Sequence, residues 1–424
     1  TVTATDAIGN TGTATTSVSV DLTAPTLTVN PVAGDNIINA AESVGPVTIT
    51  GTASASEAGQ LVTVTFNGVD YQQSVQDDGN WTVNLPASVT QGIADGTYPV
   101  SVSLTDAAGN VSTQALTVVV DASLASQPTV ALDAISGDNY LNQSEAGADL
   151  AVTGTTTNVT AGQTVTVTLN GVAYTALVQA DGSWSATVPA ADLAALTDGA
   201  QTLTATVADV AGNTGSNFAE FTVVAQAASL PTISIDPVTS DDVVNNQEAQ
   251  SDVLITGSSQ RIPEGGTVTV TLNGATYTGT VDADGNWSAT VPAAAVQALT
   301  PGANTLTASG SDVAGNVATT ADNFTVDTTA PVLNVALSAG VDNVLNAAEA
   351  AAGLVVSGTT DAGLPVSVTL NDKVYATTAD ADGNWSLTIA SGDLTALGDG
   401  TTPLSVAVTD ASGNVATSVT NLTV

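Results

Sequence analysis

The sequence predicts an all-β protein, a tandem array of four seven-stranded Greek-key β-sandwiches preceded by a partial unit. Three observations predict this architecture. β-Branched and turn-forming residues dominate the composition, which is 43% hydrophobic but only 3% aromatic. Short runs of alternating apolar and polar residues recur along the chain, and three different motifs repeat with one common period of about 100 residues.

Length and composition indicate several small domains without covalent staples. A chain of 424 residues is too long for one ordinary domain and suits several of about 100 residues each. Cysteine is absent, so no disulfide holds the fold together. Histidine is also absent, so zinc and copper lack their usual ligands.

The charge balance is strongly acidic. Forty carboxylates face only Arg261 and Lys373, for a formal net charge of −38. Such a surface repels phosphate, which excludes nucleic acid and anionic lipid as partners. Uncompensated carboxylates attract cations, and Ca²⁺ is the hard divalent cation that oxygen ligands favour. The sequence has no apolar stretch long enough to span a membrane. It also lacks a signal peptide with a charged region followed by an apolar region, so we expect a soluble segment without a targeting signal of its own.

Three motifs share the period of about 100 residues. The Asp-Gly turn, Asp-Gly-x-Trp, begins at Asp78, Asp181, Asp284 and Asp382. The Asp-Asn loop, Asp-x-x-Gly-Asn, begins at Asp6, Asp106, Asp209, Asp312 and Asp410. The acidic segment comprises Asp35, Asn36, Asn39 and Glu42, then Asp138, Asn139, Asn142 and Glu145, then Asp241, Asp242, Asn245 and Glu248, and finally Asp342, Asn343, Asn346 and Glu349.

A period of this length corresponds to a whole domain. We predict repeat 1 at residues 22–124, repeat 2 at 125–227, repeat 3 at 228–327 and repeat 4 at 328–424. Residues 1–21 match only the C-terminal strand pair of a preceding unit. Because an isolated hairpin is marginally stable in water, we expect residues 1–21 to be frayed or ordered only by a neighbour.

Repeat 2 illustrates the expected elements. Thr164–Leu169 alternates threonine with apolar residues, and Asn170-Gly171 follows as a two-residue hairpin turn. The predicted strands are 129–135, 149–156, 163–170, 172–179, 183–188, 200–209 and 214–224. The single Trp of each repeat begins a strand after a turn, and we expect it to fill the core.

Connections in a Greek-key sandwich alternate between its two ends. The Asp-Gly turn and the Asp-Asn loop should lie where the chain enters a repeat, which we call the N-terminal pole. The acidic segment should lie where the chain leaves, at the C-terminal pole, beside Asp95-Gly96, Asp198-Gly199 and Asp399-Gly400. The junctions between repeats are therefore the predicted cation sites.

Each acidic motif has a metal-binding interpretation and a metal-free alternative. Ca²⁺ takes six to eight oxygens, which closely spaced Asp, Asn and Glu supply. In the acidic segment, Asn142 could instead cap a short helical turn while Glu145 interacts with its dipole. In the Asp-Asn loop, Asp209 could form an Asx-turn in which Gly212 supplies positive φ. The sequence leaves both alternatives open.

The linkers between repeats carry acids and prolines. Asp21, Asp121 and Asp327 are linker acids, and Pro25 and Pro331 stiffen two of the junctions. Residues 225–231 contain no acid. If linker carboxylates set rigidity, the junction between repeats 2 and 3 should be the most flexible.

Taken together, the period, the Asp-Asn loop, the Asp-Thr-Thr-Ala-Pro linker and the acidic segment resemble the bacterial immunoglobulin-like extender repeats of giant repeats-in-toxin (RTX) adhesins of Gram-negative bacteria. The resemblance covers the whole chain. It implies extracellular modules that bind Ca²⁺ near their junctions and stiffen a fibre, which projects a distal ligand-binding region from the cell surface after type I secretion. It also implies metal ligation by the linker acids, the loop acids and the acidic segments, whereas the distal ligand is not encoded here.

Two other classes of function are weaker interpretations. A carbohydrate- or surface-binding module would display aromatic platforms, but Tyr71, Tyr174, Tyr277 and Tyr375 recur at expected core positions. An enzyme such as a glycosidase would need a paired-carboxylate cleft. Here the carboxylates recur in every repeat at loop positions, so we predict that the chain is not an enzyme.

Overall fold

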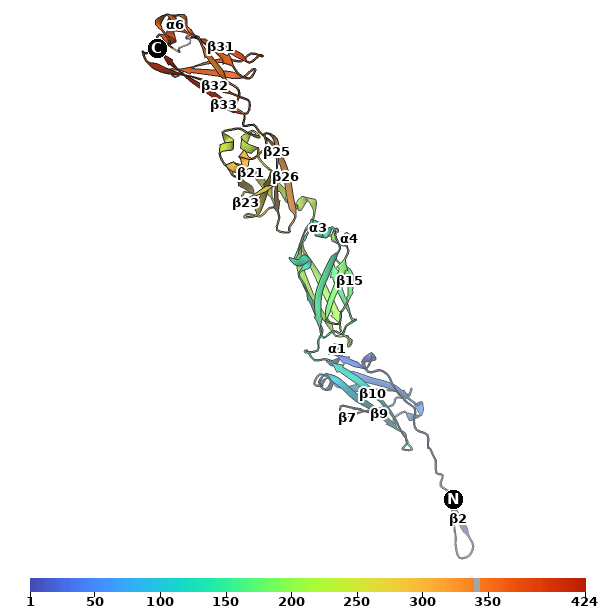
Figure 1. The fold of residues 1–424 in the computed structure, drawn as a ribbon. Helices are drawn as coiled ribbons and strands as arrows, with labels where there is room; N and C mark the ends of the chain where they lie inside the picture. The colour runs from blue at the N-terminus through green and yellow to red at the C-terminus, as the bar shows by residue number, and fades with distance from the viewer. Residues whose placement is uncertain (339–343) are drawn as a thin grey trace. The chain divides into compact units, whose positions relative to one another are not determined.

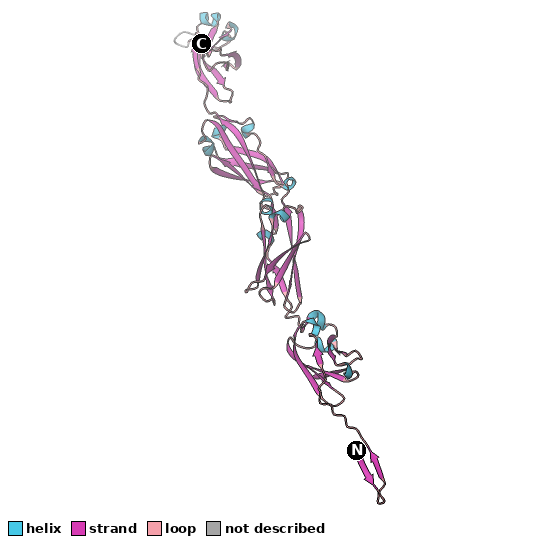
Figure 2. Ribbon diagram, turned by 90° about the vertical axis from the view of Figure 1, so that its right-hand side faces the viewer, coloured by secondary structure: helices cyan, strands magenta, loops and turns pink. Residues whose placement is uncertain are grey.

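The computed structural model describes residues 1–338 and 344–424 (Figure 1). These form two compact units, the first comprising Thr1–Leu141 with Glu145–Val223 and the second Asn142–Ser144 with Val224–Val424. Strands make up most of every repeat, with short helical segments between them (Figure 2). The chain is all-β, as the sequence predicts.

The first 21 residues contain one hairpin. Strand β1 (Val2–Thr5) pairs antiparallel with β2 (Thr11–Ala14) across an Asp-Asn loop, and all residues of both strands are exposed. The predicted strand pair is therefore present. Its fraying in solution stays a prediction.

Repeat 1 is a sandwich of two sheets. Its first strand is interrupted, so that β3 belongs to one sheet and β4 to the other. The sheets have the orders β3-β5-β8 and β4-β10-β9-β6-β7. Their strands are β3 (Leu27–Val29), β4 (Ile37–Asn39), β5 (Val47–Ala53), β6 (Leu61–Phe66), β7 (Val69–Ser74), β8 (Asn80–Leu85), β9 (Gly96–Thr105) and β10 (Val111–Asp121). Strand β3 runs antiparallel to β5, whereas β4 runs parallel to β10. The chain therefore changes sheet before the acidic segment ends.

Repeat 2 has the same topology, with sheets β11-β13-β16 and β12-β18-β17-β14-β15. Its strands are β11 (Thr129–Leu132), β12 (Tyr140–Asn142), β13 (Leu150–Thr157), β14 (Thr164–Leu169), β15 (Val172–Leu177), β16 (Ser183–Val188), β17 (Gly199–Ala208) and β18 (Thr214–Val224). All seven predicted strands are present. Sequence analysis missed β12, because three residues paired with a distant strand leave no alternating pattern.

Repeat 3 joins its two layers into one eight-stranded sheet, in the order β19-β21-β24-β23-β22-β25-β26-β20. The strands are β19 (Thr232–Ile233), β20 (Val243–Val244), β21 (Val253–Gln260), β22 (Thr267–Leu272), β23 (Ala275–Val281), β24 (Asn286–Val291), β25 (Gly302–Ser311) and β26 (Val317–Val326). The layers join because the end of β23 pairs with β24 at Thr280 and Val281.

Repeat 4 returns to two sheets, β27-β28-β31 and β30-β29-β32-β33. Its strands are β27 (Asn334–Leu337), β28 (Leu354–Thr359), β29 (Pro365–Leu370), β30 (Lys373–Thr378), β31 (Asn384–Ile389), β32 (Thr401–Thr409) and β33 (Val415–Thr423). Val344 bridges in parallel to Thr423. The predicted site residues Asp342 and Asn343 lie outside the described residues.

Short helical segments occupy the connections. The α-helices are α1 (Ala40–Ser43), α2 (Ala87–Thr90), α3 (Gln143–Ala146), α4 (Ala190–Leu193), α5 (Ala293–Gln297), α6 (Ala347–Ala352) and α7 (Ser391–Leu394). The 3₁₀ segments are η1 (Val32–Gly34), η2 (Ala55–Glu57), η3 (Ile135–Gly137), η4 (Ala227–Ser229), η5 (Val238–Ser240) and η6 (Glu248–Gln250). In repeats 1, 2 and 4, an α-helix carries residues of the acidic segment.

One Trp fills each core, as predicted. Trp81, Trp184, Trp287 and Trp385 are no more than 3% exposed. A glycine lies directly across the sheet from every Trp, in the pairs Gly51–Trp81, Gly154–Trp184, Gly257–Trp287 and Gly358–Trp385. A Cβ on any of these glycines would overlap both the indole and a backbone carbonyl of the neighbouring strand. The sequence analysis did not single out these glycines.

The hairpin turns confirm the predicted turn chemistry. Asn67, Asn170 and Asn273 have φ of 47–48° and are followed by glycines with positive φ. In repeat 4, Asn371 and Asp372 adopt φ of 51° and 59°. Aspartate thus takes the place of the glycine without changing the turn.

Candidate metal sites at the repeat poles

The Asp-Asn loop closes on its own carboxylate. In repeat 2, Asp209 Oδ1 accepts hydrogen bonds from the backbone N–H groups of Ala211 and Asn213, each at 2.9 Å. Asp209 Oδ2 accepts from Asn213 Nδ2 at 2.9 Å. The loops of Asp6, Asp106, Asp312 and Asp410 make the same three bonds. All five loops therefore form the Asx-turn of the metal-free alternative, and a cation there would share oxygens that already accept hydrogen bonds.

These bonds also stabilise the ionised carboxylate. The Asn110 side chain, with backbone N–H groups, lowers the pKa of Asp106 below its ordinary value despite partial burial. Three of the loop acids are buried, with Asp106 and Asp312 9% exposed and Asp209 7% exposed, whereas Asp6 is exposed. The loop thus holds negative charge at the N-terminal pole.

The Asn that ends each loop also binds the incoming linker. Asn110, Asn213 and Asn414 donate Nδ2–H to the backbone carbonyls of Asp21, Asp121 and Asp327, at 3.2, 3.0 and 2.9 Å respectively. Each linker acid is therefore anchored beside a loop acid, although 83 to 88 residues separate the two acids in sequence.

In repeat 3 the same carbonyl belongs to a different residue type. Asn316 donates Nδ2–H to Val224 O at 2.8 Å. Val224 thus occupies the position that an aspartate holds in the other three linkers. The linker before repeat 3 therefore lacks its acid at this one residue. A valine side chain offers no oxygen to a cation there.

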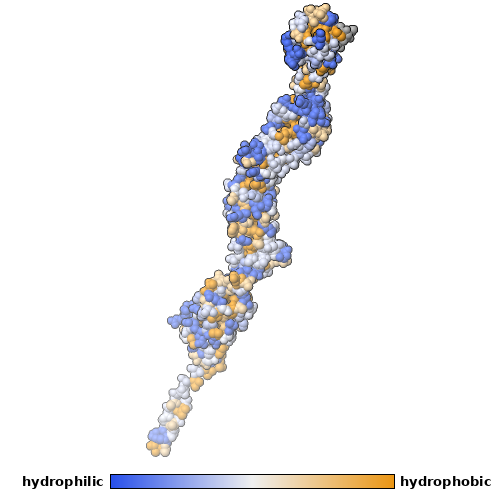
Figure 3. Space-filling model, turned by 90° about the vertical axis from the view of Figure 1, so that its left-hand side faces the viewer, coloured by the Kyte–Doolittle hydropathy of each residue, from blue (hydrophilic) through white to orange (hydrophobic). Residues whose placement is uncertain are grey.

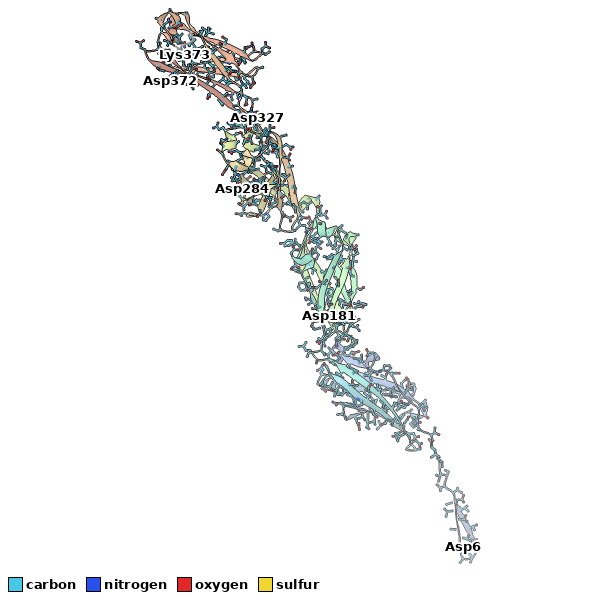
Figure 4. All side chains as sticks on the ribbon, viewed as in Figure 1. Asp6, Asp181, Asp284, Asp327, Asp372 and Lys373 are labelled. Carbon is cyan, nitrogen blue, oxygen red and sulfur yellow. The ribbon has the colours of Figure 1, made fainter. Side chains whose placement is uncertain are left out.

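The linker carboxylates differ in their partners. Asp327, labelled in Figure 4, lies in the linker before repeat 4. Its carboxylate accepts from the Thr329 N–H and from the Ser412 hydroxyl, the latter at 2.7 Å. Asp21 accepts from the Thr23 N–H at 3.0 Å. Asp121 Oδ1 is buried and has no hydrogen-bond partner among the described residues. Burying an unpaired carboxylate oxygen is unfavourable. A cation bound to Asp121 Oδ1 would offset this unfavourable burial energy.

At the N-terminal pole of repeat 1, three carboxylates line one surface depression. Asp21, Glu57 and Asp106 surround it together with Ser19 and Ser56. Sequence analysis missed Glu57, because it belongs to no repeated motif.

The Asp-Gly turns use different carboxylates in different repeats. Asp78 and Asp181 accept from the N–H two residues later, at 2.9 and 3.0 Å. In repeats 3 and 4 the accepting carboxylates are Asp282 and Asp380 instead. The predicted Asp284 and Asp382 instead donate their backbone N–H to these carboxylates.

At the C-terminal pole, the acidic segment forms capping boxes. Asn39 Oδ1 accepts from the Glu42 N–H and Glu42 Oε2 accepts from the Asn39 N–H, both at 3.0 Å. Equivalent boxes join Asn245 to Glu248 and Asn346 to Glu349. The helix-capping alternative is thus present in repeats 1, 3 and 4. In repeat 2, Asn142 ends β12 and Glu145 lies in α3.

The beginning of the acidic segment is also held by local hydrogen bonds. The carboxylates of Asp35, Asp138 and Asp241 accept from the N–H two residues later. The side-chain Oδ1 atoms of Asn36, Asn139 and Asp242 accept from the N–H four residues earlier, and all three residues have φ of 62–70°. These contacts shape the turn that carries the chain into β4, β12 or β20.

Taken over the described residues, no three carboxylates converge closely enough to form a ready-made metal cage. A Ca²⁺ shell at these poles would therefore also use amide carbonyls, backbone carbonyls and water. The assignment of the individual residues to Ca²⁺ stays a prediction. Helices in the described part of the chain are too short or too polar to traverse a lipid bilayer.

Asp95 ties the end of repeat 1 to the linker that follows it. Its carboxylate accepts from the N–H groups of Ala122 and Ser123, at 2.9 and 3.0 Å, and from the Ser123 hydroxyl at 2.5 Å. The Ser123 hydroxyl is the main cause that lowers the pKa of Asp95 from 3.8 to about 2. An exposed carboxylate thereby orders the first residues of a linker.

This contact predicts a pH-dependent contribution to stability. Because the pKa is lowered on folding, the contribution is present above pH 3.8 and is lost as the pH falls toward 2. We expect Asp95→Asn to melt below the wild type at pH 7 and the gap to close between about pH 4 and pH 2. Thermal unfolding of both proteins across this range measures the gap, and a gap independent of pH would contradict the role of Asp95.

The tyrosines pack as the sequence predicts. Tyr71, Tyr277 and Tyr375 are partly buried against the cores of their repeats. Tyr174 donates its hydroxyl to Asp192, and Tyr375 donates to Asp393. In Figure 3, apolar residues on the visible surface are interspersed with polar ones. These tyrosines therefore contribute to the cores of their repeats.

Comparison with known proteins identifies the domain family of the four repeats. The family described as bacterial Ig-like domain matches residues 30–122, 125–224, 238–328 and 338–424. The chain is 37% identical to a Ca²⁺-stabilised adhesin with which an Antarctic bacterium binds ice, covering 95% of this chain and 99% of that one, with a TM-score of 0.40. Among curated proteins, none matches.

Two further adhesin structures are similar. A 1.5-MDa bacterial ice-binding adhesin, studied for retention at the host cell surface, is 35% identical over 72% of this chain and 98% of that chain, with a TM-score of 0.37. A tetra-tandem repeat from the extending region of a large adhesion protein is 28% identical over 94% of this chain and 98% of that chain, with a TM-score of 0.33.

Proposed function

Because this chain belongs to the bacterial Ig-like domain family, in four tandem copies, we propose that it is the extender, or stalk, of a secreted cell-surface adhesin of the RTX type. Its repeats are structural and non-enzymatic. The stalk carries a distal ligand-binding region away from the bacterial cell, and Ca²⁺ at the junctions sets its stiffness. The domain boundaries at residues 22, 125, 228 and 328 belong to the same proposal.

The observation that carries the calcium part is the placement of linker and loop acids at the N-terminal poles. At the start of repeat 2, Asn213 binds both the Asp209 carboxylate and the Asp121 carbonyl. The buried, unpartnered Oδ1 of Asp121 supports a cation at this place. The sequence identity to adhesin repeats, one of them from a Ca²⁺-stabilised protein, points in the same direction.

The residues that would hold Ca²⁺ differ among the poles. Repeat 1 offers Asp21, Glu57 and Asp106, repeat 2 offers Asp121 with Asp209, and repeat 4 offers Asp327 with Asp410. Repeat 3 offers Asp312 beside Val224 and lacks the linker carboxylate. When bound, the cation would neutralise paired carboxylates and join two repeats through shared ligands. We therefore expect weaker Ca²⁺ binding at the start of repeat 3.

Solution scattering on the full chain tests this proposal. With Ca²⁺ we expect a narrow, extended distance distribution and a raised melting temperature, and with a chelator a broader distribution and a lower melting temperature. An excess of Mg²⁺ serves as the control, because it demands near-octahedral geometry and keeps its waters. If neither quantity responds to chelator, the calcium part of the proposal is wrong while the stalk remains.

A further inference from the structure

The junction between repeats 1 and 2 contains a direct hydrogen-bonded contact that uses no metal. Asn213 Oδ1, in the Asp-Asn loop of repeat 2, accepts from the backbone N–H of Ala40 in repeat 1 at 2.9 Å. Asn39 Nδ2 of repeat 1 donates in return to Ala211 O of repeat 2 at 3.1 Å. The loop and the acidic segment, which lie on different repeats, therefore exchange bonds in both directions.

The Asn213 side chain makes three hydrogen bonds. Its Nδ2 donates to Asp209 Oδ2 and to the linker carbonyl of Asp121, and its Oδ1 accepts from Ala40. Asn213 is only 5% exposed. A buried amide with all of these bonds made is fixed in position, and losing one partner leaves a polar group unpaired.

The same contact recurs within the second unit, between repeats 3 and 4. Asn414 Oδ1 accepts from the Asn246 N–H at 2.8 Å, and Asn414 Nδ2 donates to Asp327 O at 2.9 Å. Asn414 is 2% exposed. A Cβ on Gly413 would lie only 3.2 Å from Asn245 Nδ2, and one on Gly212 would lie 3.6 Å from Asn39 Nδ2. The glycine of the loop thus leaves room for the Asn of the preceding repeat.

We infer that Asn213 and Asn414 are latch residues, which set the orientation of one repeat on the next by hydrogen bonds that persist without Ca²⁺. Each latch joins the Asn of an Asp-Asn loop to the first helical or turn N–H of the preceding acidic segment. The inference adds a metal-free component to the proposed stalk.

The chain offers matched variants for testing the latch between repeats 1 and 2. Ala40→Pro removes the donated N–H and places the proline Cδ where the amide hydrogen faced Asn213 Oδ1. It keeps the start of α1, since proline is well tolerated at the first helical position and the preceding Asn39 is already extended. Ala347→Pro is the control, because Ala347 begins α6 in the same way but no repeat follows it in the described residues. Asn213→Ala removes the acceptor. Asn110→Ala is its control, because Asn110 makes the equivalent loop and linker bonds in repeat 1, away from the junction between repeats 1 and 2.

Because the chain has no cysteine, two spin labels can be introduced at the exposed strand positions Thr113 and Ser216 of the full chain. In excess chelator, we expect Ala40→Pro and Asn213→Ala to broaden the distance distribution between these labels, and Ala347→Pro and Asn110→Ala to leave it unchanged. Asn213→Ala should also speed amide exchange at Ala40 roughly fivefold, as expected for one net hydrogen bond. The double variant should broaden the distribution no more than either single one.

Unchanged distributions in both junction variants, or equal broadening in the controls, would overturn the latch. Chelator alone could broaden the distance distribution of the wild type as much as it broadens those of the variants. The orientation of the repeats would then depend on the cation, so the latch would be wrong and the calcium proposal would stand. If chelator leaves the wild type unchanged while the variants broaden, the latch stands and the calcium proposal fails.

Discussion

Replacing Gly51 by alanine should destabilise repeat 1 selectively. Gly51 lies in β5 opposite Trp81, and an added Cβ would overlap the indole ring and the carbonyl oxygen of Thr28 on β3. Neither group can move away, because Trp81 is fully buried and β3 is paired with β5 on the other side. Overpacking against backbone costs about 3 kcal/mol, a large share of the about 5–15 kcal/mol that stabilises a small domain.

Hydrogen exchange by mass spectrometry locates the effect, because each repeat contributes its own peptides. We expect peptides of repeat 1 to lose protection while those of repeats 3 and 4 keep it. Gly45→Ala is the matched control, since Gly45 lies in the same repeat, lacks positive φ and has open space where its Cβ would stand. Equal protection in Gly51→Ala and Gly45→Ala would show that the core can shift to accept a methyl group.

Replacing Asp121 by asparagine should have opposite effects with and without Ca²⁺. In chelator, the substitution removes a charge whose Oδ1 is buried and unpartnered, so we expect repeat 2 to be unchanged or slightly stabilised. In Ca²⁺ at 100 times the dissociation constant, a bound site contributes about 2.7 kcal/mol. The variant should lose most of this contribution. Thermal unfolding of the variant and the wild type in both conditions measures whether their difference in stability changes sign.

Val224 provides the complementary test. It occupies the linker-acid position at the start of repeat 3, where Asn316 binds its carbonyl. Val224→Asp should give this pole the linker carboxylate that the others have, and so create or strengthen Ca²⁺ binding measurable by calorimetry. Val224→Asn, of similar size without the charge, is the control. If Asp121→Asn lowers stability equally in Ca²⁺ and in chelator, Asp121 acts as an ordinary structural residue and not as a metal ligand.

Much of the fold of this protein follows from local patterns. The period-two alternation of Thr164–Leu169 places its apolar residues on one face of a strand. The Asn170-Gly171 turn needs positive φ, which these two residues accept. A lone Trp among small aliphatic residues has no better place than the core. Each of these features is decided by the chain within a few residues, so the sequence is sufficient.

The acidic residues could not be divided between metal binding and hydrogen bonding in the same way. Asp209, Asn39 and Glu42 fit a calcium shell by composition, yet Asp209 closes an Asx-turn and Asn39 and Glu42 form a capping box. Oxygen ligands and hydrogen-bond acceptors are the same atoms, so a motif alone cannot separate the two uses. The sequence also placed the turn acids at Asp284 and Asp382, where the fold uses Asp282 and Asp380.

The sequence by itself determined the repeating sandwich, its hairpins, its Trp-centred cores and the gathering of acids at both poles. Only the tertiary structure decided which polar atoms meet: that Asn213 accepts from Ala40, that Val224 stands where other repeats have an acid, and that Asp121 keeps an unpartnered oxygen. The physical reason is distance along the chain. These contacts join residues about 90 to 170 positions apart, and their geometry depends on how two complete sandwich ends fit together.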